Sequence, residues 1–411
     1  MNSAEFWLLI VAICFIAGFL IQFSIFRYAH VINPLSLFLI FDIGVLTLLS
    51  AVVAEELNDG QEVGLTSVLY LTVVYMGGFL LAYIPRRFYL PCKLFNGLLS
   101  VVGRSANLTE YSYLNQLFLI SLTLGLFFLL MQASGAGTLW LTDSRLAYQS
   151  YRAGVGLIYL MVQWTLLASL LYCLWARKPK LPGLFFLVFI YSVMAYFTGS
   201  KANILFGAIL GGIYYNFFIK KIPTVLFLLT PFVILGFFLV LLLLQGSYSD
   251  TLSAISYFRD YAETTGKFLL RFDEFGLQWG YGALSDLWFY VPRALYSDKP
   301  FEYGIVLIHK VLFPGAAEQG STPGVLPWAL AYLDFGAMGV FIFGFITGFV
   351  RRGAYESFLE NQRSIFAFVL MAQLSLIGIF AYATLPLIIA IAVFLDLFVR
   401  KKIVFFSSAR S

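Results

Sequence analysis

Repeated apolar runs of about 20 residues restrict the fold of this chain more than any other feature of its sequence. A run of this length crosses the hydrocarbon core of a bilayer, which is ~30 Å thick, as an α-helix. Only 11% of the 411 residues are charged and 61% are apolar, whereas about a quarter of the residues in a soluble domain are charged. A transmembrane β-barrel would alternate apolar and polar residues instead. The sequence therefore predicts an all-α polytopic membrane protein.

The apolar runs predict about 11 transmembrane helices in a single membrane domain that covers residues 1–411. The beginning, MNSAEFWLLI, has no basic region and no evident cleavage site, so we interpret it as the first helix and not as a removed signal peptide. The predicted helices are 5–26, 31–54, 64–84, 114–133, 155–176, 183–197, 202–219, 223–244, 325–349, 364–381 and 383–399.

The basic residues predict how these helices are oriented. When Arg400, Lys401 and Lys402 are placed in the cytoplasm, the short segments on the opposite side contain only three basic residues, Arg145, Arg152 and Lys201. Because cytoplasmic loops carry an excess of Lys and Arg, the N-terminus is predicted outside and the C-terminus inside. The net charge of +5 is explained by this orientation, and we expect no nucleic-acid partner.

Residues 245–324 form the one long segment that is too polar to span a membrane. In the predicted topology this long loop lies on the outer face, as does the shorter connector 134–154. The helical spacing of Leu252, Ile255, Phe258 and Ala262 begins what we expect to be two or more amphipathic helices against the membrane surface.

The few outward cations are candidate ligands for phosphate groups, because guanidinium forks match phosphate oxygens and lysine adds a point charge. The alternative is that they pair with nearby acids, as Arg259 would with Glu263 and Arg271 with Asp273 or Glu274. The candidates are Arg145, Arg152, Lys201, Arg271, Arg293 and Lys299.

Two of these arginines share a spacing. Ten residues separate Arg145 from Gly156, and ten residues separate Arg293 from Gly304. An Arg-x10-Gly pattern therefore occurs once at each of the two outward segments.

Together with these patterns, the chain resembles the bacterial oligosaccharide repeat-unit polymerases, also called O-antigen polymerases. Their two substrate-handling periplasmic loops each carry an Arg-x10-Gly motif. The stretch TGSKANILFGAIL resembles the Thr-Gly-Ser-Arg segment of that family, with Lys201 in place of the arginine. The stretches VPRALYSDKP and YLDFGAMGVFIFG are also similar to the family.

The resemblance implies a bacterial inner-membrane enzyme with a periplasmic N-terminus, a cytoplasmic C-terminus and two periplasmic loops, 134–154 and 245–324. Its substrates would be oligosaccharides on undecaprenyl diphosphate, which it would join into O-antigen or a related surface polysaccharide. It would resemble the type C membrane glycosyltransferases and need no metal or other cofactor. Partners would be the lipid bilayer, a chain-length regulator and a flippase. Arg145, Arg152, Gly156, Lys201, Arg271, Arg293, Lys299 and Gly304 would contact the diphosphate or the glycan.

The residues independently allow this chemistry. A guanidinium such as that of Arg293 would stabilise the charge that develops on a leaving phosphate. His309, the one histidine predicted on the outer face, would act as the general base. The alternative is that His309 is a packing residue of an interfacial helix, IVLIHKVLF, and that an acid is the base. The rival acids are Asp273, Glu274, Asp298 and Glu302.

Other residue types add little to this picture. The three cysteines suggest neither a disulfide nor a metal site, and His30 is predicted on the opposite face from His309. Asp42 and Asp334 lie in predicted spans, where acids are costly and often functional. For Asp42, a polar tie to another helix is favoured over a relay.

Three alternative functions remain. A lipid-linked oligosaccharide flippase or transporter more often has repeated halves and short loops. An O-antigen ligase would use a similar donor with a different acceptor. A membrane scaffold or sensor is disfavoured, because the long loop is the one extended polar segment of the chain.

Overall fold

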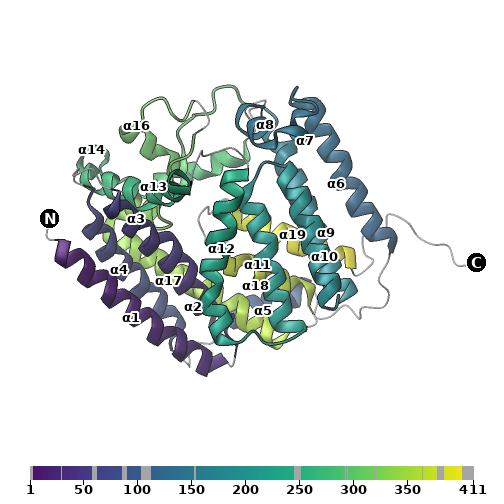
Figure 1. The fold of residues 1–411 in the computed structure, drawn as a ribbon, viewed down its shortest axis with the longest axis horizontal. Helices are drawn as coiled ribbons and strands as arrows, with labels where there is room; N and C mark the ends of the chain where they lie inside the picture. Colours follow the sequence, from purple (N-terminus) through teal and green to yellow (C-terminus); the bar gives the residue numbers. More distant parts are fainter. Residues whose placement is uncertain are drawn as a thin grey trace, which may run out of the picture. The chain divides into compact units, whose positions relative to one another are not determined.

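The computed structural model describes residues 3–28, 30–57, 63–85, 90–102, 113–151, 154–244, 251–291, 293, 295–318, 321–362, 364–376 and 384–399. Within these ranges the regular elements are all helices (Figure 1). The helices cluster into two compact units. Unit 1 comprises Met1–Lys93, Thr224–Tyr355 and Leu374–Leu385, and unit 2 comprises Leu94–Pro223, Glu356–Gln373 and Pro386–Ser411.

All eleven ranges predicted as spans are helical over most of their length. The corresponding helices are α1 (Ser3–Tyr28), the continuous segment α2–η1–α3 (Pro34–Leu37, Phe38–Leu49 and Ser50–Glu56), α4 (Leu65–Tyr83), α6 (Tyr113–Ala133), α9 (Gly156–Arg177), α10 (Leu181–Phe197), α11 (Lys201–Phe218), α12 (Thr224–Leu244), α17 (Ala329–Glu360), α18 (Ile365–Leu376) and α19 (Thr384–Val399). Between the predicted spans the structure also contains helices that the sequence analysis missed, among them the amphipathic α5 (Leu90–Val102).

By length and composition, six helices of the described part can cross a membrane. They are Ala4–Tyr28, Pro34–Glu56, Leu65–Tyr83, Tyr113–Ala133, Gly156–Arg177 and Ala329–Glu360. The chain is thus an all-helical protein with several candidate membrane spans, as predicted, while the full number of eleven spans stays a prediction.

In unit 1, the segment Pro34–Glu56 begins with a side-chain cap. The Asn33 carboxamide oxygen accepts hydrogen bonds from the backbone N–H groups of Leu35 and Ser36, at 3.1 and 3.0 Å. Pro34 occupies the first turn, where its missing N–H is no loss. The next 12 residues, Phe38–Leu49, continue as a π-helix.

The described part of the long loop is folded. Its first helix, α13 (Thr251–Leu270), covers the range where the sequence analysis predicted one, and it packs against α3 and α4. Phe258 and Ala262 on this helix are buried, in agreement with the predicted apolar face. Short helical turns follow: α14 (Phe272–Phe275), α15 (Tyr281–Ser285), η2 (Asp286–Tyr290), η3 (Gly304–Ile308) and α16 (His309–Leu312). Whether these elements lie on a membrane surface stays a prediction.

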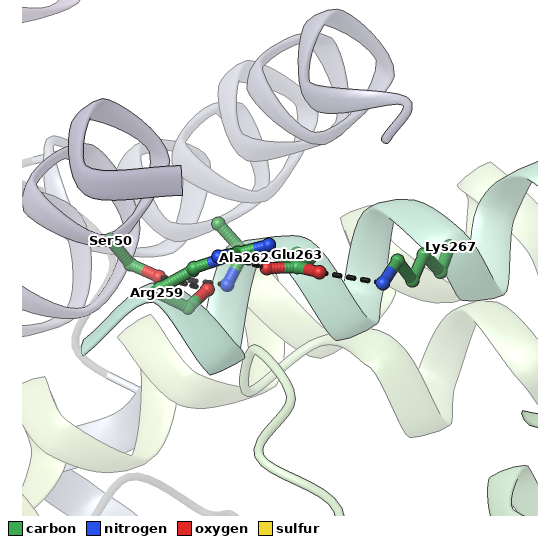
Figure 2. A network of polar contacts seen from close by, with 5 residues as sticks. All are labelled: Ser50, Arg259, Ala262, Glu263 and Lys267. Carbon is green, nitrogen blue, oxygen red and sulfur yellow. Dashed lines mark hydrogen bonds and ion pairs between the residues drawn. The ribbon is translucent and has the colours of Figure 1, made fainter. Parts of the chain in front are cut away.

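Figure 2 shows how α13 is held to α3. The Ser50 hydroxyl of α3 accepts a hydrogen bond from the Ala262 N–H at 2.7 Å and donates one to the Arg259 carbonyl at 3.5 Å. Glu263, which directly follows Ala262, forms ion pairs with Arg259 and with Lys267, and its distance to Lys267 is 2.6 Å. The predicted Arg259–Glu263 pair is therefore confirmed.

The middle of the long loop is attached to a kink in α17. Phe335 and Gly336 are non-helical, and the carbonyls just before them accept hydrogen bonds from the loop. The Gln278 N–H donates to the Leu333 carbonyl and the Trp279 N–H to the Asp334 carbonyl, both at 3.0 Å. The buried Asp334 carboxylate also accepts from the first N–H groups of α15, at 2.8 and 2.9 Å. This acid in a predicted span therefore anchors the loop.

Unit 2 includes α6, α9, α10 and α11, and α9 packs against both α6 and α10. Between α6 and α9 the chain forms two short helices, α7 (Leu139–Thr142) and α8 (Ser144–Tyr151). Buried Trp140 anchors them, since its indole N–H donates to the Ser134 hydroxyl at 2.9 Å.

Candidate functional site

The predicted site residues are divided between the two units. Unit 1 contains Arg271, Arg293, Lys299, Gly304 and His309. Unit 2 contains Arg145, Gly156 and Lys201, of which Lys201 is the first residue of α11. Arg152 lies outside the described residues.

Arg293 is the first residue of the loop that ends at Gly304, and its side chain holds this loop together. Its guanidinium donates to the backbone carbonyls of Lys299 and Pro300 at 2.6 and 3.2 Å, with a longer contact of 3.4 Å to the Ser297 carbonyl. The guanidinium carbon also lies 3.8 Å from the centre of the Phe301 ring. These contacts use two nitrogens of Arg293 on the protein's own backbone, so its observed geometry is that of a loop clamp.

Gly304 closes the same loop. Its N–H donates to the buried Ser285 hydroxyl at 2.9 Å, and its φ of +56° is a conformation that glycine adopts at little cost. A Cβ at this position would also collide with the Asp286 carboxylate. The Arg293–Gly304 spacing therefore corresponds to a loop held at its start by a guanidinium and at its end by a tightly packed glycine.

Lys299 lies inside this loop, with its ammonium 4.7 Å from the centre of the Tyr303 ring. Partial burial, and then the neighbouring charge of Arg293, lower the pKa of Lys299. Two cations therefore lie near each other, an arrangement that an anionic ligand would stabilise.

Arg271 is held by a local acid, as one sequence interpretation expected. It donates to both carboxylate oxygens of Glu274, at 2.6 and 2.7 Å, and to the Val311 carbonyl at 3.1 Å. The bidentate contact to Glu274 leaves Arg271 less suited to phosphate binding than a sequence reading of its charge suggests.

His309 is buried at the beginning of α16, with 1% of its surface exposed. Its ring stands edge-on to Phe313 at 5.7 Å, and its Nδ1 has no hydrogen-bond partner within the described part of the chain. Burial lowers the pKa of the imidazole below its ordinary value of 6.5, so the ring is neutral at pH 7. A neutral ring suits a general base, but a base must reach the acceptor hydroxyl, and the observed burial requires the loop to open first.

The rival acids are more accessible than His309. Asp273 and Glu274 are exposed, Glu302 is partly exposed, and exposed Asp298 accepts a hydrogen bond from the Ser297 hydroxyl at 3.1 Å. Accessibility therefore favours the acids as bases, whereas the ordinary pKa favours the histidine.

In unit 2, Arg145 lies on α8 with its guanidinium carbon 5.4 Å from the centre of the Tyr148 ring. Its Nε is buried and has no hydrogen-bond partner among the residues described. A buried donor without a partner is costly, and an anion bound beside α8 would remove that cost. This distinguishes Arg145 from Arg293, whose two terminal nitrogens donate hydrogen bonds to backbone carbonyls.

The Thr198–Lys201 turn, which connects α10 to α11, packs against α8. Gly199 has a φ of +69°, and a Cβ on it would collide with the Ser144 carbonyl and the Tyr148 side chain. The turn and Arg145 are more than 50 positions apart in sequence, yet they lie on adjoining elements. Two of the stretches that carry the family resemblance are thus brought together.

Gly156 differs from Gly304. It begins α9, and an added Cβ would meet no atom within 4 Å. The two Arg-x10-Gly patterns therefore have different structural roles, and only the second glycine is sterically required.

Sequence reasoning did not identify Ser285, Asp286 or Tyr148 as neighbours of the candidate residues. Their positions depend on turns that no periodicity in the sequence marks. Among the described residues, no group of three or more His, Cys, Asp and Glu side chains is arranged to hold a metal ion. Comparisons of the chain with protein-family models, with curated proteins and with solved structures find no match.

Proposed function

We propose that the chain polymerises oligosaccharide repeat units carried on undecaprenyl diphosphate, at the periplasmic face of the bacterial inner membrane. The acceptor hydroxyl of a new repeat attacks the first sugar carbon of the growing chain. The bond from that carbon to the diphosphate breaks, undecaprenyl diphosphate leaves, and a general base takes the hydroxyl proton. No oxidant, reductant or further reactant is needed.

One observation carries the proposal: the contact between the TGSK turn and α8. It places the turn next to a helix whose arginine has a buried donor without a hydrogen-bond partner in the described structure. Such a donor at a membrane protein's outward segment suits a phosphate of a lipid-linked substrate. In the proposal Arg145 binds the diphosphate, with Lys201 and Arg152 as further cations.

The Arg293–Gly304 loop has a second role. The hydrogen bonds from Arg293 to backbone carbonyls preorganise this segment, which carries Lys299 and the partly buried Arg293. Preorganised positive charge stabilises a developing phosphate charge without further rearrangement. His309 is the proposed base, with Glu302 and Asp298 as its rivals.

The test uses purified protein in liposomes with a synthetic undecaprenyl-diphosphate-linked repeat. A ladder of longer lipid-linked glycans supports a polymerase. Arg145→Ala should abolish this ladder. Lys310→Ala, which removes an exposed cation next to His309, should leave it unchanged. In cells, a polymerase deletion leaves single repeats on the lipid A core. Unattached polymer would identify a ligase, and repeats retained on the inner leaflet would identify a flippase.

A further inference from the structure

Unit 2 contains a cavity of about 320 Å³ that is lined by residues of α6, α9 and α10. This volume is within the range of ordinary small-ligand sites, which is roughly 300–1,000 Å³. Buried Leu166, Leu170 and Cys173 of α9 line the inner side. More exposed side chains of the flanking helices form the rims, namely Ile120 and Leu124 of α6 and Phe186 and Ile190 of α10. The cavity is therefore a groove whose rims are open to the surroundings of the chain.

Two of the hydroxyls that line the groove are satisfied by their own helices. The Thr123 hydroxyl donates to the Leu119 carbonyl at 2.8 Å, and the Ser169 hydroxyl donates to the Thr165 carbonyl at 2.7 Å. The groove is therefore lined mostly by hydrocarbon, and these two hydroxyls are already hydrogen-bonded. An apolar chain fits such a surface better than water does.

Positive charge is concentrated at one end. Arg177, the last residue of α9, lines the groove, as does Gln116. The guanidinium carbon of Arg177 lies 5.6 Å from the centre of the Tyr113 ring. The exposed Lys178 and Lys180 follow directly in sequence. The groove therefore has an apolar length and a cationic end.

The length of the groove along α9 matches the hydrocarbon thickness of one bilayer leaflet. The α9 residues that line it run from Leu166 to Arg177, about 16 Å at the helical rise of ~1.5 Å per residue. Half of a hydrocarbon core that is ~30 Å thick is about 15 Å. A long polyprenyl chain would exceed this length, whereas one acyl chain fits it.

We propose that this groove binds one acyl chain of an anionic glycerophospholipid, with the lipid phosphate at Arg177. The phosphate is a bidentate partner for the guanidinium, and the flanking lysines add attraction at the membrane surface. In the predicted topology this end is cytoplasmic, on the opposite side from the long loop. The site is thus separate from the proposed glycosyl transfer, and either proposal can fail alone.

The test is native mass spectrometry of the purified full-length protein, with phosphatidylglycerol or with phosphatidylcholine of the same chains. The wild-type protein should retain phosphatidylglycerol, and excess inorganic phosphate should not displace it, because the acyl chain supplies much of the binding. Arg177→Gln should weaken retention by about tenfold or more, the effect of removing one charge-assisted hydrogen bond. Lys220→Gln, at an exposed cation after α11 in the same unit, is the matched control.

A second pair of variants tests the apolar part. Ile190→Trp at the rim should fill the groove and abolish retention without disturbing the buried inner wall. Leu157→Trp, at an exposed position of α9 outside the groove, should leave retention unchanged. Equal retention of both lipids, release by inorganic phosphate, or unchanged retention in Ile190→Trp would each overturn the proposal. Monodisperse gel filtration of every variant ensures that a loss reports the site and not unfolding.

Discussion

The guanidinium of Arg351 in α17 contacts both carboxylate oxygens of Asp42 in η1, at 2.7 and 3.3 Å. Both side chains are almost completely buried. An isolated acid in a membrane span is costly, and this pairing offsets part of that cost, although the Nε of Arg351 has no hydrogen-bond partner among the described residues. The expected polar tie at Asp42 is thus confirmed, and its partner is an arginine that lies between the predicted spans 325–349 and 364–381.

Removing one partner of this pair should destabilise the protein more than removing both. Asp42→Asn or Arg351→Met alone leaves an uncompensated buried group, and we expect each to lower the free energy of unfolding by about 3–5 kcal/mol. The double variant Asp42→Leu/Arg351→Met should recover much of that loss. Thermal unfolding in detergent measures this, with Glu274→Gln as the control, because the Arg271–Glu274 pair is exposed. Additive losses in the double variant would contradict the account.

Gly199 should tolerate no side chain. Gly199→Ala combines a positive φ with a collision against α8, so we expect it to displace the TGSK turn from Arg145 and to shorten or abolish the polymer at normal protein level. Gly212→Ala in the adjoining α11 is the matched control, since an added Cβ there meets no atom within 4 Å. Normal polymer in Gly199→Ala would separate the turn from the function.

Arg145 and Arg293 should fail in different ways. Arg145→Ala removes a donor without a partner in the described structure, so activity should fall by about a hundredfold or more with the long loop intact. Arg293→Lys loses the geometry that reaches two carbonyls, so activity should fall and limited proteolysis between Tyr290 and Gly304 should accelerate. Unchanged cleavage in Arg293→Lys would contradict the clamp role.

His309 gives a prediction about pH. If it is the base, its neutral form is required, and because burial lowers its pKa, activity should persist as the pH falls to the ordinary value of 6.5 and decline only below it. His309→Gln should lose turnover while lipid-linked substrate binding survives. Polymerisation rates against pH for the wild type and for Glu302→Gln make the comparison. Near-native turnover in His309→Gln would move the base to an acid.

Glu263 should contribute stability that acid removes. Burial alone would raise its pKa, but hydrogen bonds from Arg259 and Lys267 lower it below the ordinary 4.5. The contribution is therefore present above pH 4.5 and is lost as the pH falls through the lowered folded-state pKa. Melting temperatures from neutral pH to about pH 3 should fall more for the wild type than for Glu263→Gln. Parallel curves for the two proteins would show that the network in Figure 2 is energetically neutral.

The helices and the short-range pairs could be predicted from the residue pattern alone. All eleven predicted ranges are helical over most of their length in the described part of the chain, because an apolar run in lipid must satisfy its backbone groups internally. The Arg259–Glu263 pair follows from the geometry of one helical turn. The end of α17 was misplaced, since the sequence analysis ended this helix at residue 349 and it continues through Arg351 to Glu360.

The contacts between groups that are distant in sequence could not be predicted in this way. Asp42 and its partner Arg351 are 309 positions apart, and the Gly199 turn reaches α8 across two predicted spans. The burial of His309 agrees with the packing alternative of the sequence analysis, whereas the occupation of Arg293 by its own loop is not visible in the residue pattern. Periodicity reports the environment along one helix. The choice of partner depends on how separate helices and turns pack, and the spacing of residues along the chain does not encode that packing locally.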